Sequence, residues 1–213
     1  MNTKLIGLTG TIGAGKDTTY GFLNTASLRL LGVPATRIAF GDNVKKVCYA
    51  AFGGIEKYYY GTQEEKDKTE GLEFWAEKLG EPYSTYRRLA QTVGTEVFRN
   101  HVNHDFWVLA AENQLSKSIN DSTLTIVTDV RFDNEAELIR SKGGIVVNVI
   151  NTSLRPKVTE PNHNHVSEDG IMAELVDYTI VASNLAELQQ SAGVLFEQFY
   201  TGAESASGNR ISL

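Results

Sequence analysis

Residues 8–18 read Leu-Thr-Gly-Thr-Ile-Gly-Ala-Gly-Lys-Asp-Thr and follow the apolar run Leu5-Ile6. The spacing of Gly10, Gly15 and Lys16 matches the phosphate-binding pattern G-x-x-x-x-G-K. Glycines let the backbone curl so that N–H groups face a polyphosphate, and the next helix adds the unpaired N–H groups of its first turn. Lys16 brings a cation to the outer phosphates. The stretch therefore predicts a strand, a loop that binds a nucleoside triphosphate, and a helix. The alternative is a tight turn without a ligand.

The residue after Lys16 departs from the usual pattern. A Ser or Thr hydroxyl that binds Mg²⁺ is common at this position, whereas this chain has Asp17, followed by Thr18 and Thr19. A carboxylate is a hard oxygen ligand, so Asp17 can meet magnesium directly or through water. Alternatively, the negative charge of Asp17 only stabilises the helix by its attraction to the positive end of the helix dipole. The sequence leaves both roles open.

Composition and charge narrow the class of protein. A chain of 213 residues suits one α/β domain with room for a helical insertion. The net charge of −6 argues against broad binding to a nucleic acid polymer, which needs a basic surface. Cys48 is the single cysteine, so no internal disulfide is possible, and this fits a reducing cytoplasm. Its apolar neighbours favour a buried thiol over a nucleophile. We also expect no association with a membrane, because no apolar run approaches the ~18 residues of a membrane-spanning helix.

Strand and helix patterns alternate along the chain. Strands are expected at 4–9, 37–40, 124–128, 145–150 and 178–182, and helices at 16–31, about 42–52, 72–79, 84–100, 105–117, 134–141 and 185–199. Strands that are apolar on both faces predict an α/β fold with a parallel sheet covered on both sides. Residues 1–200 are expected to form one domain with a helical insertion at about 53–122 and a lid-like loop at about 151–168. The Gly/Ser-rich residues 201–213 are expected to form a flexible tail.

Charged residues follow several of the expected strands. Parallel sheets bind ligands at the carboxyl ends of their strands, and the residues expected there are Asp42, Lys45, Asp129, Arg131, Arg155 and Lys157. Asp42 or Asn43 is also expected to cap the second helix. Asp129 can hold hydrated magnesium or can simply cap a helix or end the strand. Arg131 can clamp a phosphate with its rigid fork of donors, or it can form an ion pair with Asp129, Asp133 or Glu135.

The helix expected at 84–100 carries a polar stripe. Helical spacing places four residues on one face, namely Arg88, Gln91, Thr95 and Arg99. The same spacing gives an opposite, apolar face of Tyr86, Ala90, Val93 and Val97. The stripe is either an ordinary solvated surface or a site that recognises a phosphate and a base edge.

Two further clusters have both a functional and an ordinary interpretation. His163 and His165 lack the additional Cys or His ligands that a zinc site needs, so a loop that closes over a ligand is the better interpretation there. The run Tyr58-Tyr59-Tyr60 can stack on a base, although packing at the surface is the commoner role.

Several motifs together resemble the deoxynucleoside monophosphate kinases of bacteriophages. They are Gly-Lys-Asp-Thr at 15–18, Gly-Thr-Glu-Val-Phe-Arg at 94–99, Trp107-Val108, Asp-Val-Arg-Phe-Asp-Asn-Glu-Ala at 129–136 and His-Val-Ser-Glu at 165–168. The resemblance implies a P-loop kinase fold, a three-layer sandwich around a five-stranded parallel sheet. It implies transfer of the γ-phosphoryl group of ATP, with Mg²⁺, to a deoxynucleoside monophosphate in the cytoplasm, the host cytoplasm if the chain is phage-encoded. Ser183-Asn184-Leu185 differs from the Asn-Gly-Thr pattern that often borders adenine in related kinases.

The resemblance also suggests roles for individual residues. The ATP-binding residues would be Gly13, Ala14, Gly15, Lys16, Asp17 and Thr18. The acceptor-binding residues would be Asp42, Lys45, Arg88, Gln91, Arg99, Trp107, Arg131, Asn134, Arg155 and Glu168. Lys16, Asp17 and Arg131 would be catalytic, and Asp17 and Asp129 would face the metal. The loop at about 151–168 would close over the reactants.

Two rival functions fit the phosphate-binding loop as well. Dephospho-coenzyme A kinases have a very similar glycine loop, although the residues at 94–99 and 165–168 count against them. A protein that binds ATP and switches conformation without chemistry belongs to another class. A homodimer is expected only from the general frequency of dimers.

Overall fold

The computed structural model describes residues 4–120, 123–153 and 170–200. These residues form two compact units. Unit 2 consists of the described residues 39–114, and unit 1 consists of the rest. The insertion expected at about 53–122 lies largely in unit 2, which begins earlier because it includes the helix that starts at Phe40. Each unit is described by itself below.

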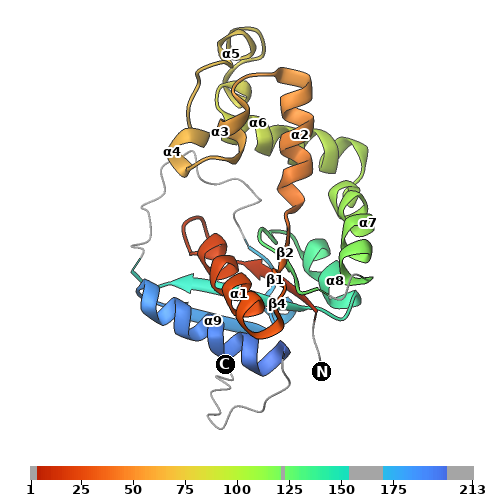
Figure 1. Ribbon diagram of the computed structural model, residues 1–213. Helices are drawn as coiled ribbons and strands as arrows, with labels where there is room; N and C mark the ends of the chain where they lie inside the picture. The colour runs from red at the N-terminus through yellow and green to blue at the C-terminus, as the bar shows by residue number, and fades with distance from the viewer. Residues whose placement is uncertain (1–3, 121–122, 154–169, 201–213) are drawn as a thin grey trace. The chain divides into compact units, whose positions relative to one another are not determined.

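Unit 1 is built on a five-stranded sheet (Figure 1). Its strands are β1 Leu5–Thr9, β2 Thr36–Ile38, β3 Thr125–Val127, β4 Ile145–Asn151 and β5 Tyr178–Ala182. They lie in the order β2-β3-β1-β4-β5, and every neighbouring pair is parallel. The predicted α/β fold with a five-stranded parallel sheet is confirmed. Central β1 is buried along its whole length, as a strand covered on both faces must be.

Helices cover both faces of this sheet. Ile6 and Leu8 of β1 pack in one core with Leu23 of α1 (Lys16–Leu31) and Leu195 of α9 (Leu185–Tyr200). Gly7 lies between them and faces the other way, because side chains alternate along a strand. A Cβ on Gly7 would lie 2.4 Å from Cδ1 of Ile139, so α8 (Asp133–Ser141) packs tightly on the opposite face. Unit 1 also contains a short 3-10 helix, η4, at Ala173–Leu175. The sheet and the helices on its two faces make three layers.

The bounds of α1 follow from the glycines on either side. Gly15 precedes the helix with a φ of 102°, and Gly32 ends it with a φ of 73° while its N–H donates to the carbonyl oxygen of Leu28. Both φ values lie in the left-handed region that favours glycine. The helix therefore has the bounds expected from the sequence.

The segment after β2 corrects the prediction. The strand ends at Ile38 and α2 (Phe40–Phe52) begins at Phe40, so Phe40 is helical rather than the end of a strand. The N-cap is Ala39, which offers no side-chain hydrogen bond, and the expectation that Asp42 or Asn43 caps this helix is wrong. Asp42 lies within the first turn instead, where its Oδ1 forms an ion pair with Nζ of Lys45 at 2.9 Å.

Unit 2 is helical in its described residues. Its remaining elements are α3 Glu56–Tyr60, α4 Gln63–Lys66, α5 Glu73–Leu79, η1 Glu81–Tyr83, α6 Tyr86–Gln91 and η2 Thr92–Val102. Helix α7, Phe106–Asn120, has residues in both units. The core is largely aromatic, and the rings of Tyr59 and Tyr86 meet edge to face with centroids 4.7 Å apart.

The tyrosine run lies mostly inside this core, contrary to both interpretations of it. Tyr58 and Tyr59 are buried, and only Tyr60 is exposed. The two buried hydroxyls are satisfied, since that of Tyr58 donates to Oε2 of Glu70 at 2.9 Å and that of Tyr59 to the carbonyl oxygen of Gly53 at 3.0 Å. Tyr58 and Tyr59 can therefore belong to the core, because each hydroxyl has a hydrogen-bond partner there.

The expected helix at 84–100 is two helices of different pitch. After α6 the chain continues as a π-helix, η2, whose hydrogen bonds span one residue more than those of an α-helix. The wider turn changes which side chains share a face. Thr95 is 6% exposed and Arg99 5%, whereas Val97 is 39% exposed. The predicted polar stripe through Arg99, and the apolar face through Val97, are therefore wrong beyond α6.

Across the described residues, the helices are too short or too polar to cross a membrane.

Candidate active site

The glycine loop lies at the carboxyl end of β1 and leads directly into α1. Gly10, Gly13 and Gly15 have φ values of 135°, 79° and 102°, which other residues adopt only with strain. A Cβ on Gly10 would lie 2.3 Å from the carbonyl oxygen of Val149, so no side chain fits there. The expected strand, curled loop and helix are thus present together.

Lys16 reaches back across this loop. Its Nζ donates to the carbonyl oxygen of Gly10 at 2.6 Å and to that of Thr11 at 2.9 Å. These bonds hold the ammonium group over the loop at the N-terminus of α1. Asp17 and Thr18 are exposed in the first turn, whereas Thr19 is buried and its hydroxyl donates to the carbonyl oxygen of Gly15.

The loop fits the triphosphate of ATP. The N–H groups in the first turn of α1 have no partner within the helix, and the helix dipole adds positive potential where they point. Lys16 contributes a full positive charge beside them. Residues 13–18, predicted to bind ATP, all belong to this loop and first turn.

The carboxylates predicted to face magnesium are Asp17 and Asp129. Asp129 is half-buried and lies two residues after the end of β3. Among the described residues, no group of three or more His, Cys, Asp and Glu side chains is placed to hold a metal ion. Magnesium bound with a nucleotide typically uses only one or two carboxylates, together with phosphate oxygens and water. Two carboxylates of this kind fit that role, and each assignment stays a prediction.

The segment after β3 is held by the buried carboxylate of Glu135, whose bonds to main-chain groups were not predicted from the sequence. Oε2 of Glu135 accepts the main-chain N–H of Arg131 at 2.8 Å and that of Phe132 at 3.3 Å. Glu135 is itself buried in the first turn of α8. It therefore fixes the backbone that carries Arg131, while Asn134 lies in the same first turn. The spacing of an acid three residues after the N-cap was the available signal.

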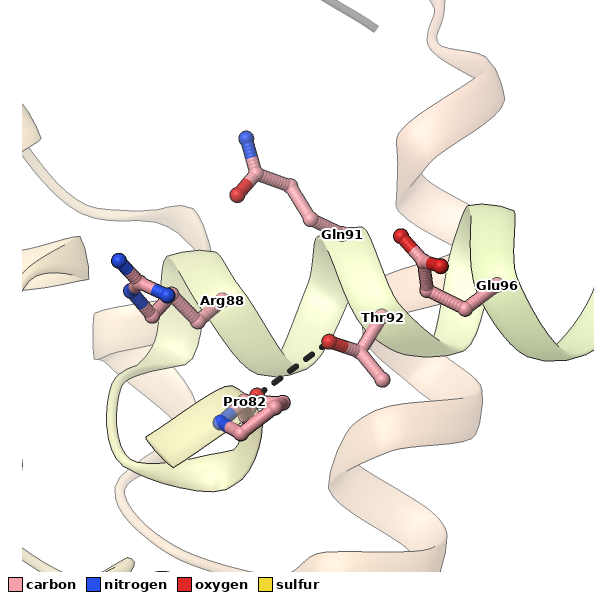
Figure 2. Close-up of a pocket in the computed structure, with 5 residues that line it drawn as sticks. All are labelled: Pro82, Arg88, Gln91, Thr92 and Glu96. Carbon is pink, nitrogen blue, oxygen red and sulfur yellow. Dashed lines mark hydrogen bonds between the residues drawn. The ribbon is translucent and has the colours of Figure 1, made fainter. Parts of the chain in front are cut away.

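Unit 2 contains a pocket of about 330 Å³ (Figure 2). It is lined by Pro82, Arg88, Gln91, Thr92 and Glu96. The guanidinium group of Arg88 forms an ion pair with Glu81, and the hydroxyl of Thr92 donates to the carbonyl oxygen of Pro82 at 3.4 Å. The pocket thus combines a cation and an amide, which suit a phosphate or a base edge, with a carboxylate, which suits only the donors of a base edge.

The structure brings together only some of the predicted acceptor-binding residues. Arg88 and Gln91 line the pocket. Arg99 and Trp107 are buried instead, where Nη1 of Arg99 donates to the carbonyl oxygen of His104 at 3.0 Å and Nε1 of Trp107 to that of Gly94 at 2.7 Å. Arg155 and Glu168, and most of the lid-like loop at about 151–168, lie outside the described residues, as do His163 and His165.

The structure favours a buried, protonated thiol at Cys48 over a nucleophile. It is buried in the core of unit 2, and burial raises the pKa of its thiol from 9.0 to about 12. A thiol that stays protonated is a poor nucleophile. The predicted role as a small buried apolar residue is confirmed.

Comparison with known proteins identifies relatives. Residues 65–191 match the model of the deoxynucleotide monophosphate kinase family. A "Putative deoxynucleotide monophosphate kinase" of Acanthamoeba polyphaga mimivirus is 28% identical over 170 residues, which is 74% of this chain and 79% of that protein. The deoxynucleoside-5'-monophosphate kinase of Escherichia phage T5 is 32% identical over 100 residues, 45% of this chain and 38% of the phage enzyme. A shikimate kinase from Acinetobacter baumannii, solved in complex with shikimate, aligns over 94% of each chain with a TM-score of 0.43 and 15% identity.

Proposed function

Because the chain belongs to the deoxynucleotide monophosphate kinase family, we propose that it transfers the γ-phosphoryl group of ATP to a deoxynucleoside monophosphate, giving the diphosphate and ADP. The family match over residues 65–191 is the observation that supports this most. The glycine loop, which lies outside the matched residues, supports it independently. The relatives from phage T5 and mimivirus make the cytoplasm of an infected cell the proposed compartment.

The loop of unit 1 would bind the donor. The N–H groups of residues 13–18 and the ammonium group of Lys16 are the groups suited to its phosphates. Asp17 and Asp129 would hold Mg²⁺, which neutralises phosphate charge when bound. Arg131, on the backbone that Glu135 fixes, would add a second cation for the transferred group.

The pocket of unit 2 would bind the acceptor. Arg88 offers donors for a phosphate or a base, and its ion pair with Glu81 keeps the guanidinium in a defined orientation. Gln91 offers both an amide donor and an amide acceptor to a base edge. Asp42 and Lys45 in α2 remain proposed acceptor contacts.

This division of roles suits the chemistry of the reaction. A phosphate oxygen of the acceptor is already ionised at neutral pH, so no strong general base is needed. The chief barrier is the repulsion between two anions and the charge on the moving phosphoryl group. Lys16 and Arg131 would reduce both by electrostatic stabilisation.

An assay of ADP release across the four deoxynucleoside monophosphates and dephospho-coenzyme A tests the proposal. We expect ATP- and Mg²⁺-dependent turnover with at least one of the four deoxynucleotides. Turnover only with dephospho-coenzyme A would replace the proposed acceptor, and ATP binding without turnover on any substrate would favour a sensor.

A further inference from the structure

One buried hydroxyl lacks a partner in the fold. Among the described residues, Oγ1 of Thr128 is the single buried side-chain nitrogen or oxygen atom that makes no hydrogen bond. Thr128 is only 2% exposed. Its main chain is satisfied, since its N–H donates to the carbonyl oxygen of Ile38 at 3.0 Å. The unsatisfied group is therefore the hydroxyl alone.

The position of Thr128 relates this hydroxyl to the glycine loop. Thr128 follows β3, which pairs with β1 through Val127 opposite Gly7. Ile126, two residues earlier, packs in the same core as Leu8 and Ala14 of the loop. Thr128 is the first residue after β3, at the carboxyl end of the strand, and Asp129 follows it. Parallel sheets bind ligands at this edge, where the glycine loop also follows β1.

Other buried hydroxyls of unit 1 show how unusual this one is. The hydroxyl of Thr19 donates to the carbonyl oxygen of Gly15 and that of Ser27 to the carbonyl oxygen of Val33. The hydroxyls of Ser118 and Thr125 bond to each other. Leaving a buried polar group unsatisfied destabilises a protein, and valine would fill the same space without that cost. A hydroxyl kept there at a loss in stability points to a partner that arrives with the ligand.

We propose that Thr128 is a positioning residue for the magnesium–nucleotide group, and that its hydroxyl gains its missing hydrogen bond only when that group is bound. The partner is an oxygen of the bound group, either of a phosphate or of a water on the metal. This inference rests on the proposed function, since it requires ATP at the loop of residues 13–18. The role of Thr128 is to orient, and no proton or phosphoryl group passes through it.

Two substitutions at Thr128 and one at a matched position test the inference. Thr128→Val removes the hydroxyl and keeps the shape, and Thr128→Ser keeps the hydroxyl. Thr125→Val makes the same change three residues earlier, in β3, at a hydroxyl that already has a partner. For each, the melting temperature without nucleotide and the Kd for ATP with and without Mg²⁺ are measured, followed by kcat.

The expected results distinguish a role of the Thr128 hydroxyl in nucleotide binding from a role in the stability of the fold. Thr128→Val should melt at or above the wild-type temperature, yet bind ATP with Mg²⁺ roughly tenfold more weakly, the scale of one hydrogen bond. Thr128→Ser should recover most of that affinity. Thr125→Val should melt lower and bind ATP like the wild type. A loss seen only with Mg²⁺ would identify metal-bound water as the partner, and a loss in both conditions a phosphate oxygen.

Three outcomes would overturn the inference. Wild-type affinity and kcat in Thr128→Val would show that the hydroxyl has no role in binding. A lower melting temperature or failure to fold would show that it already has a structural partner. A wild-type chain that binds no ATP would overturn the proposed function as well, whereas the first two outcomes leave that function intact.

Discussion

The carboxylate of Glu135 accepts the main-chain N–H of Arg131 at 2.8 Å, so a buried acid in α8 fixes the backbone of an arginine four residues earlier. The same oxygen accepts the N–H of Phe132. A single side chain thus satisfies two main-chain groups where the chain passes from β3 to α8. The orientation of Arg131 therefore depends on a residue that need not touch a substrate.

Replacing Glu135 should affect both stability and catalysis. Glu135→Ala leaves two main-chain N–H groups without their acceptor, and we expect a loss of about 1–3 kcal/mol in the free energy of unfolding. We also expect kcat to fall, because Arg131 loses its fixed backbone. Urea unfolding and turnover measure the two effects. Glu137→Ala, at an exposed position of the same helix, is the control. Equal behaviour of the two variants would contradict the role of Glu135.

Replacing Lys16 should lower the rate of transfer by orders of magnitude without unfolding the protein. Lys16→Ala removes the cation above the glycine loop, and loss of such a charge from the transition state typically costs 10²-fold or more in kcat. Turnover and the melting temperature are the measurements. Lys117→Ala, an exposed lysine of α7, should behave as wild type. Turnover close to wild type in Lys16→Ala would rule out this loop as the catalytic site.

Two adjacent arginines of α6 give a matched test of the acceptor pocket. Arg88 lines the pocket, whereas Arg87 lies outside it and pairs with Asp67 at 2.6 Å. Arg88→Ala should raise the KM for the deoxynucleoside monophosphate about tenfold or more, because it removes a charged contact, and should leave the KM for ATP unchanged. Arg87→Ala should change neither constant. Similar acceptor KM values in the two variants would place the acceptor elsewhere.

The raised pKa of Cys48 predicts a loss of stability in alkali. Its pKa in the folded protein is about 12, above the ordinary value of 9.0, so the unfolded chain loses its thiol proton first. Stability from this group is complete below pH 9 and declines as the pH rises towards 12, by about 1.4 kcal/mol per pH unit. Urea unfolding at pH 8 and pH 10 should show a steeper decline for the wild type than for Cys48→Ala. Parallel declines would mean that the thiol is accessible to solvent.

Features fixed by neighbouring residues could be predicted from the sequence. Gly15 and Gly32 set the ends of α1 because each must adopt a positive φ. The five strands were found because buried parallel strands are apolar on both faces. The family was found because its motifs are local.

Features decided by tertiary packing could not be predicted. The π-helical turns of η2 bury Thr95 and Arg99 and expose Val97. No residue type in that stretch predicts a π-helix over an α-helix. Tyr58 and Tyr59 look polar in the sequence, but their hydroxyls find partners in the core. The missing partner of Thr128 is visible only once every neighbour of its hydroxyl is placed.

The large apolar cores of the two units have no residue in common. One gathers aliphatic side chains around the sheet, and the other gathers aromatic rings among short helices. Under the roles proposed above, mutations that reshape the acceptor pocket need not disturb the packing beneath the glycine loop. A change in the accepted nucleobase would then leave the aliphatic core beneath the phosphate-binding residues as it is.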